Sequence, residues 1–372
     1  MINNEKTYLS STRLKSLDAL RGFDMFWIIG GDAIFRALAK ATNNGFLISL
    51  LPQLEHAEWQ GFSAYDVIWP LFLFIVGVAM TFSIRKRLDQ GDSKKEIYFK
   101  VIKRTLLLFV FGLIIDCNIL TYDVSQFHIY NGALHTIGMG YLIAALIMLN
   151  FRLLWQIIIA LSIPIIYWVL LVTIPVPGYG AGVLTPDGNF AIYIDKLVLG
   201  GLQHGSTYAY ILPSFMFGSM VMFGALTGQL LLLRSDKTDR SKILWLVGLG
   251  VCCLVIGLIW NEWFPFIKKI KNSSFMIYAE GWCFLLTALF YFCFDVLKKD
   301  KWAFGFIVIG MNPLIVYMAT QLFKFTTIAD IFVGGLEPHL GVWFCLLQTT
   351  VAFTIVWLIL FWMYRKKSFI KI

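Results

Sequence analysis

Charged residues are scarce in this chain of 372 residues: Asp, Glu, Lys and Arg make up 14% of it, whereas hydrophobic types make up 59%. Soluble domains carry about a quarter charged and about half apolar residues. The sequence also shows no low-complexity tract, no convincing internal repeat and no segment with the composition of a soluble domain. This composition excludes an ordinary water-soluble globular protein.

Cysteine pairs with metal-binding or redox spacing are also missing. The six cysteines lie in or beside apolar segments and none forms a Cys-x-x-Cys motif. A disulfide framework or a zinc site is therefore not expected, and no metal is predicted. Buried free thiols are the interpretation that we favour. The cysteines are Cys117, Cys252, Cys253, Cys283, Cys293 and Cys345.

Long apolar runs are what the chain has in abundance. Segments of about 20 apolar residues recur, which is the length that crosses about 30 Å of hydrocarbon as a helix. The hydropathy pattern predicts an all-α polytopic membrane protein, a single transmembrane domain over residues 1–372 with short cytoplasmic tails at 1–16 and 365–372. The bundle of about ten predicted helices covers residues 17–36, 64–84, 104–121, 132–150, 153–174, 209–233, 243–261, 274–296, 303–323 and 340–364.

The basic residues are unevenly distributed between the segments that join these helices. If the N-terminus is cytoplasmic, 23 of the 31 Lys and Arg residues lie on cytoplasmic segments and seven on the opposite side. Cytoplasmic loops of membrane proteins carry such an excess. The bias therefore predicts that both termini are cytoplasmic. The net charge of +9 is read as a signal of topology and not of nucleic-acid binding.

The connecting segments differ in length and character. Residues 85–104 alternate in charge, which favours a solvated helix or hairpin on the cytoplasmic side. Three longer segments, 37–63, 175–208 and 324–339, face outward, and the second is rich in Gly, Pro and Asp, which favours turns. Long loops in compact proteins are often functional. We therefore expect a binding face on the outer side.

Ionisable residues inside predicted membrane helices are costly, at about 2.5–3.5 kcal/mol each, and tend to be functional. Asp18 and Arg21 are three residues apart and share a helix face, either as an inward salt bridge or to hold a ligand from the cytoplasm. Asp32 follows two glycines near the outer end of the same helix, where an interrupted backbone suits a cavity. For Asp66 at the start of the second helix, a capping role is favoured.

Two histidines stand near the outer side. His135 lies near the end of the fourth helix, where a packing role is favoured. His56 lies between Glu55 and Glu58 just before a span, and an imidazole exchanges protons readily at neutral pH. Two classes of function remain open: an enzyme that uses His56 as a base beside Asp32, or a proton- or ion-coupled transporter of a sugar or other small polar solute.

Several blocks in a fixed order resemble one family. The blocks are RLKSLDALRGFDMFWIIGGD, HAEWQGFSAYDVIWPLFLFIVGVAM, NGALHTIGMGYLIAALIMLNF, ILPSFMFGSMVMFGALTGQLL, FPFIKKIKNSSF and GMNPLIVYM. With these blocks the chain resembles bacterial relatives of heparan-α-glucosaminide N-acetyltransferase, a family of transmembrane acyltransferases, over about residues 13–320.

The resemblance implies transfer of acetyl from cytoplasmic acetyl-CoA to the amino group of a glucosamine-type sugar on the far side, here the periplasm of a bacterium with the protein in its inner membrane. It assigns the catalytic role to His56, whose His-Ala-x-Trp-x-Gly pattern matches, while Asp32 replaces an asparagine of the family. The acetyl group passes either directly in a ternary complex, which we favour, or through an acetyl-histidine. The acceptor sugar and membrane lipid are the expected partners, a homodimer is possible in such bundles, and no nucleic acid is expected.

Further residues gain expected roles from this comparison. Trp59 is either a stacking platform for a sugar or an interfacial aromatic residue. The residues expected at the acceptor are Trp59, Lys271, Asn272, Ser273, Asn312 and His135. Those expected near the coenzyme A portion are Asp18, Arg21, Arg85 and Arg104.

Overall fold

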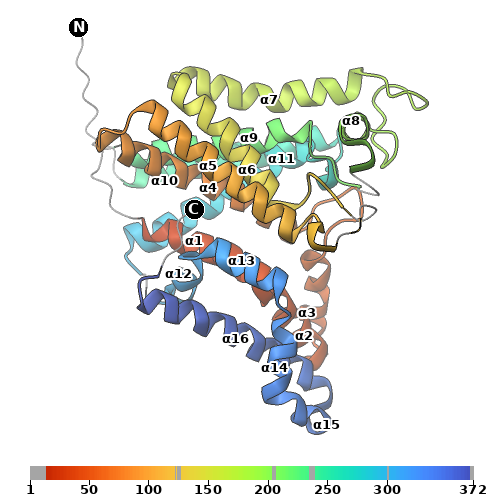
Figure 1. The fold of residues 1–372 in the computed structure, drawn as a ribbon, viewed down its shortest axis with the longest axis vertical. Helices are drawn as coiled ribbons and strands as arrows, with labels where there is room; N and C mark the ends of the chain where they lie inside the picture. The colour runs from red at the N-terminus through yellow and green to blue at the C-terminus, as the bar shows by residue number, and fades with distance from the viewer. Residues whose placement is uncertain are drawn as a thin grey trace. The chain divides into compact units, whose positions relative to one another are not determined.

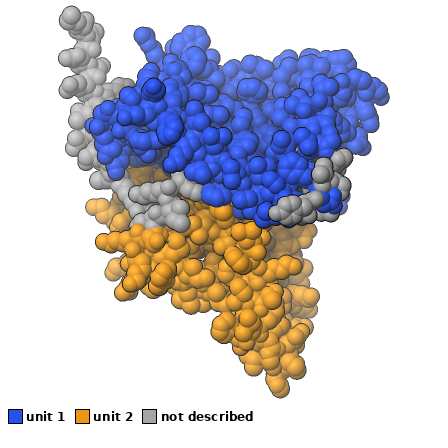
Figure 2. Space-filling view, in the orientation of Figure 1, with its two compact units in different colours: residues 1–13, 57–62, 69–288 blue, residues 14–56, 63–68, 289–372 orange. Residues whose placement is uncertain are grey.

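The computed structural model describes residues 14–121, 123, 127–202, 207–233, 239–299 and 301–368. The described chain is mainly helical, and an isolated β-bridge joins Val176 to Gly180 (Figure 1). Contacts between residues divide it into two compact units (Figure 2). Unit 1 comprises residues 1–13, 57–62 and 69–288, and unit 2 comprises residues 14–56, 63–68 and 289–372. The single domain expected from the sequence stays a prediction.

Unit 1 holds the long helices of the middle of the chain. In it, α9 packs against α6 and α7. Close approach between α4 and α9 depends on two glycines, because a Cβ on Gly77 would lie 1.9 Å from the Val221 carbonyl oxygen and one on Gly224 would lie 1.9 Å from that of Phe74. The helices are α4 (Ile68–Asp89), α5 (Lys94–Ile115), α6 (Gly132–Asn150), α7 (Leu153–Thr173), α8 (Phe190–Leu199), α9 (Pro213–Leu232), α10 (Asp239–Asn261) and α11 (Ser273–Tyr291).

The helices α7 and α10 carry many exposed apolar side chains, among them Ile166 on α7 and Leu258 on α10. In an aqueous protein such surfaces are costly, whereas lipid tails accept them. These faces are therefore the ones expected to contact lipid. Cys252 on α10 and Cys345 on α16 are exposed too, which corrects the expectation that all the cysteines are buried.

Unit 2 joins the first described helices to the last ones (Figure 1). The helix α1 (Lys15–Phe26) packs along α12 (Phe304–Gly310). This close approach requires glycine at position 22, because a Cβ there would lie 1.7 Å from the Phe306 carbonyl oxygen. The Asp295 carboxylate accepts hydrogen bonds from the backbone N–H groups of Lys15 and Ser16 at 3.3 and 3.2 Å, which satisfies donors at the start of α1. The remaining helices are α2 (Asp32–Thr42), α3 (Gly45–Leu50), α13 (Pro313–Leu322), α14 (Phe325–Val333), α15 (Glu337–Leu340) and α16 (Phe344–Arg365).

Between α1 and α2 the chain forms a π-helical turn, Trp27–Gly31. Gly30 in this turn has a φ of 134°, a conformation that residues with a Cβ rarely adopt. The predicted first span is therefore interrupted, as its glycine pair indicated. Asp32 begins the helix that follows the interruption.

All ten apolar segments predicted from the sequence fall on helices, but the count of ten spans is not confirmed. Seven helices of the described part are long and apolar enough to cross a membrane, or up to eight if the bent pair α12–α13, with its 77° angle, is one span. Helix α1 holds 12 residues and α5 begins with a charged stretch, so neither meets the length and composition of these candidates. The segment 324–339, expected to be a loop, forms α14 and α15.

Candidate active site

The segment before α4 belongs to unit 2 at both of its ends, at His56 and at Asp66. A 3-10 turn, Ala64–Val67, begins here with Ser63 as its N-cap. The Oδ2 atom of the fully buried Asp66 accepts hydrogen bonds from the Ser63 N–H at 3.0 Å and the Ser63 hydroxyl at 3.1 Å. This is a capping box, so the capping role predicted for Asp66 is confirmed.

The second oxygen of the same carboxylate contacts the candidate base. Asp66 Oδ1 lies 2.7 Å from His56 Nδ1, and the exposed fraction is 42% for the His56 side chain and 0% for that of Asp66. Because a carboxylate only accepts, Nδ1 carries the proton in this pair, so a lone pair of the neutral imidazole would lie on Nε2. A part-exposed imidazole oriented by a buried carboxylate is the arrangement that acid–base catalysis requires.

Asp32, the partner first expected for His56, pairs elsewhere. Its Oδ2 lies 3.8 Å from Nε of Arg36, one turn later on α2. Arg36 in turn binds Glu55 Oε1 at 2.9 Å and donates to the carbonyl of Leu54. Arg36 therefore ties α2 to the residues directly before His56. The catalytic role of Asp32 stays a prediction, and Asp66 is the orienting carboxylate that sequence reasoning missed.

In unit 1, the predicted residues Asn272 and Ser273 hold a tight turn together. Asn272 Oδ1 accepts from the N–H of Ile267 at 3.1 Å, and its Nδ2 donates to the Pro265 carbonyl at 2.6 Å. The Ser273 hydroxyl donates to the carbonyl of Pro164 at 2.6 Å. Both side chains are fully buried, so their observed task is to shape the turn and the start of α11.

This turn directs Lys271 inward. Lys271 has a φ of 50°, in the left-handed region, and only 4% of it is exposed. Its Nζ lies 4.5 Å from the ring centre of Tyr208, 5.2 Å from that of Tyr210 and 5.5 Å from that of Trp69. Burial, reinforced by the neighbouring charge of Lys268, lowers the Lys271 pKa to about 7. Aromatic faces attract a cation but do not replace its full hydration.

A carboxylate in the same unit balances part of this charge. Burial raises the pKa of Asp195, on α8, to about 6, against the opposing effect of its hydrogen bonds. Its two oxygens accept from the backbone N–H groups of Ile211 at 2.9 Å and Tyr210 at 2.7 Å. Asp195 thus anchors the chain that enters α9. No pattern in the sequence distinguished Asp195 from other loop acids.

Trp59 and His135, two further predicted acceptor residues, are also in unit 1. Trp59 Nε1 donates to the Leu184 carbonyl at 2.8 Å, which fixes the half-buried indole, and Lys269 Nζ lies 6.0 Å from the centre of the ring. His135 is fully buried, with Nδ1 2.7 Å from the Asn131 carbonyl oxygen and Nε2 3.0 Å from that of Phe109. The structure thus places His135 in a packing position, and its binding role stays a prediction.

The residues expected near coenzyme A are divided between the units. Asp18 and Arg21 are in unit 2, where Arg21 Nη1 lies 3.5 Å from the carbonyl oxygen of Gly310. In unit 1, Arg85 Nε lies 3.1 Å from Oδ1 of Asp89. Arg104 stacks over Tyr141 with its guanidinium carbon 4.4 Å from the ring centre. In unit 2, Asn312, at the α12–α13 bend, donates to the Ser368 carbonyl at 3.2 Å.

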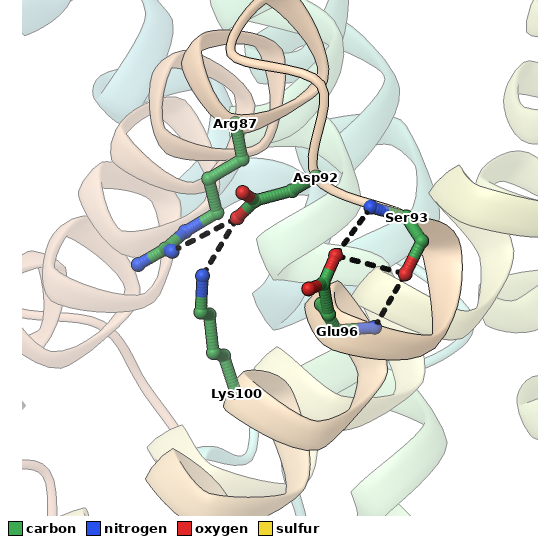
Figure 3. A network of polar contacts seen from close by, with 5 residues as sticks. All are labelled: Arg87, Asp92, Ser93, Glu96 and Lys100. Carbon is green, nitrogen blue, oxygen red and sulfur yellow. Dashed lines mark hydrogen bonds and ion pairs between the residues drawn. The ribbon is translucent and has the colours of Figure 1, made fainter.

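Residues 85–104, expected to form either a solvated helix or a hairpin, form a hairpin, since α4 and α5 are joined by a short turn there. Figure 3 shows how its charges pair: Asp92 binds Lys100 at 2.6 Å and Arg87 at 3.5 Å. The hydrogen bond from Lys100 lowers the pKa of Asp92. The Glu96 carboxylate accepts a hydrogen bond from the Ser93 N–H at the start of α5. Part of the basic charge of this hairpin is therefore already engaged within the hairpin.

Helical spans with apolar outer faces and a histidine–carboxylate pair define a polytopic membrane protein equipped for acid–base chemistry. A family profile described as heparan-α-glucosaminide N-acetyltransferase, catalytic, matches residues 13–261, more than half of the sequence, and the chain belongs to this family. The match includes His56 and Asp66 and ends before Lys271.

Two curated relatives carry the name heparan-α-glucosaminide N-acetyltransferase. The mouse protein is 26% identical over an alignment that covers 86% of this chain and 56% of the relative. The human protein is 26% identical over 97% of this chain and 60% of the relative. The chain therefore spans about three-fifths of the length of the relatives that it matches.

Proposed function

We propose that this protein is a membrane N-acetyltransferase that moves acetyl from acetyl-CoA to the amino group of a glucosamine-type sugar. The observation that carries the proposal is the 2.7 Å contact between His56 and Asp66, in a chain that belongs to this acetyltransferase family. The names of the relatives supply the acceptor class. The distribution of basic residues supports a donor site on the cytoplasmic side and an acceptor site on the periplasmic side of a bacterial inner membrane.

The chemistry needs a base because an amino sugar is largely protonated at neutral pH and an ammonium group has no lone pair. In the proposed step, the ammonium releases one proton through His56 to solvent, the amine nitrogen attacks the thioester carbonyl, and His56 Nε2 accepts the second amine proton as the N–C bond forms and the C–S bond breaks. The proton then leaves with the coenzyme A thiolate as its thiol. Asp66 keeps Nδ1 protonated and stabilises the imidazolium that forms.

The test uses purified protein in vesicles, with labelled acetyl-CoA on one side and glucosamine on the other. His56→Ala should lower the rate of acetyl transfer by about 10²–10⁴-fold, the usual contribution of a positioned base. The matched control is His339→Ala, which changes an exposed histidine on α15 and should transfer acetyl as the wild type does. Full activity in His56→Ala would show that the proposed role of His56 is wrong.

The same vesicles separate the remaining possibilities. Acetyl label that stays on the protein when acceptor is absent would indicate an acetyl-histidine in place of direct transfer. Movement of the unmodified sugar across the membrane, with no acetylated product, would indicate a transporter. Crosslinking in the vesicles would show whether two copies associate.

A further inference from the structure

A short apolar segment of unit 2 leads directly to His56. It consists of α3 (Gly45–Leu50) and the 3-10 turn Leu51–Leu54, and it carries no charged residue. None of its residues is buried against the described part of the chain, and the exposed fraction is 70% for Phe46 and 41% for Ile48. An apolar helix of about 10–14 residues is typical of a protein core, a re-entrant segment or a membrane interface. The exposure excludes a core position.

The start of this segment is fixed by polar contacts, whereas its apolar residues have no equivalent support. Asn44 Oδ1 accepts hydrogen bonds from the N–H groups of Phe46 at 2.9 Å and Leu47 at 3.3 Å. Helices shorter than about 12–15 residues are marginal in water on their own, and α3 has six residues. Water also disfavours the exposed apolar side chains. A surface other than water must therefore cover them.

The residues around the segment match a lipid surface. Lys40 is exposed in the last turn of α2, where its ammonium can meet lipid phosphates. The 3-10 turn Gly341–Trp343 also packs against α2, with 62% of Val342 and 47% of Trp343 exposed. Tryptophan is enriched where membranes meet water. A second copy of the chain fits less well, because a stable protein interface uses about 20–30 residues a side.

The far end of the segment is tied to the histidine–carboxylate pair. Gln53 Oε1 accepts a hydrogen bond from the N–H of Ala64 at 3.1 Å, and Ala64 begins the turn that holds Asp66. Arg36 on α2 donates to the last carbonyl of the segment and binds the residue directly before His56. The depth of the segment in its surroundings therefore fixes the depth of both catalytic partners.

We propose that residues 45–54 form an interfacial anchor whose partner is the surface of the lipid bilayer, on the side that His56 faces. The apolar side chains enter the boundary between headgroups and acyl chains by about 5–10 Å, and Lys40 lies among the phosphates. The anchor holds His56 and Asp66 at the level of the bilayer surface. This inference concerns a position in the membrane, and it does not rest on the proposed acetyl transfer.

The experiment places an environment-sensitive fluorophore on single cysteines of the full-length protein, without its six native cysteines, in phosphatidylcholine vesicles. Ser49→Cys labels the anchor at an exposed polar position, and Glu58→Cys is the matched exposed position outside it. The Ser49→Cys emission should be shifted to shorter wavelength and lost to a lipid with a nitroxide near its headgroup. Iodide on both sides of the vesicles should quench Glu58→Cys and leave Ser49→Cys bright.

Charge placed on the anchor tests its apolar residues. Phe46→Asp combined with Ile48→Asp should expose the Ser49→Cys fluorophore to iodide, whereas Phe332→Asp, on the exposed face of α14, should leave it shielded. If the double variant does not fold, the comparison of Ser49→Cys with Glu58→Cys decides alone.

Three results would overturn the inference. Iodide quenching of Ser49→Cys without further changes would place the segment in water. Stronger quenching by a nitroxide near the end of the acyl chain would indicate a re-entrant segment. Protection from iodide and from both nitroxides would show that protein covers the segment. Each result is obtained without acetyl-CoA or acceptor, so it leaves the test of acetyl transfer independent.

Discussion

The Asp66 carboxylate has two oxygen atoms with different tasks. Oδ2 caps the turn that starts at Ser63, and Oδ1 orients His56. One residue thus links the local fold to the proposed chemistry. A residue that only caps a helix can be one of several types. A residue that must also accept a hydrogen bond from an imidazole N–H is more restricted.

Replacement of Asp66 by Asn tests this double role. An amide can still accept from Ser63, but its NH2 group then faces His56 Nδ1 and favours the tautomer that carries the proton on Nε2. We expect kcat for acetyl transfer to fall about 10²-fold with little change in KM, because the base is misoriented while the acceptor still binds. Initial rates against acceptor concentration provide the measurement.

Asp32→Asn is the comparison for this variant, and it introduces the residue that the family resemblance places there. It breaks the 3.8 Å contact with Arg36 but leaves the Asp66–His56 pair untouched. The loss should therefore be clearly smaller than in Asp66→Asn. A larger loss of kcat in Asp32→Asn than in Asp66→Asn would indicate that Asp32, and not Asp66, orients His56.

These residues show what a sequence reveals of a site. The His-Ala-x-Trp-x-Gly pattern was enough to select His56, and the position of Asp66 before a span was enough to predict a cap. The contact between them was not predictable, because residues 57–65 between the two have no periodic pattern that fixes their path. Asp195 was missed for a similar reason: its partners are backbone groups 15 and 16 residues away.

At the scale of elements, the long apolar helices were predictable, and the glycine pair at Gly30–Gly31 indicated one of their breaks, whereas the bend between α12 and α13 was not predicted. Apolar length placed α6 at residues 132–150, in agreement with the prediction. The 77° bend between α12 and α13 occurs at Asn312–Pro313, inside a stretch that reads as one continuous apolar run. Hydropathy reports apolar content, and it does not report backbone direction.

The turn that holds Lys271 offers a test at this scale. Asn272→Ala removes the acceptor for Ile267 and the donor to Pro265 at a fully buried place. Unsatisfied buried groups cost about 1–3 kcal/mol each, so for these two groups we expect a loss of about 2–6 kcal/mol in the free energy of unfolding and a lower thermal midpoint in detergent. The measurement is a thermal unfolding scan at fixed rate.

The matched change is Asn44→Ala. Asn44 caps the exposed start of α3 by accepting from Phe46 and Leu47, and water replaces such bonds when they are lost. Its loss should be about 1 kcal/mol. If the two variants unfold at the same temperature, burial of the Asn272 hydrogen bonds has no special importance for the turn.

At the scale of the whole molecule, the orientation of the protein in the membrane decides from which side each substrate reaches the site. Of the 31 basic residues, 23 lie on the side that we assign to the cytoplasm, and moving them outward would be strongly disfavoured during insertion. The hairpin turn near Gln90 should then face the cytoplasm, and the segment near Glu58 should face outward. Both residues are exposed in the structure.

A pair of single cysteines tests this orientation. In a variant without the six native cysteines, two of which are exposed, Glu58→Cys should react with a membrane-impermeant maleimide in intact cells. Gln90→Cys should react only after the membrane is opened. Equal labelling of both sites would show a mixed orientation, and the opposite pattern would place His56 on the cytoplasmic side. In that case donor and acceptor would no longer need to meet across the membrane, and the direction of the proposed transfer would have to be revised.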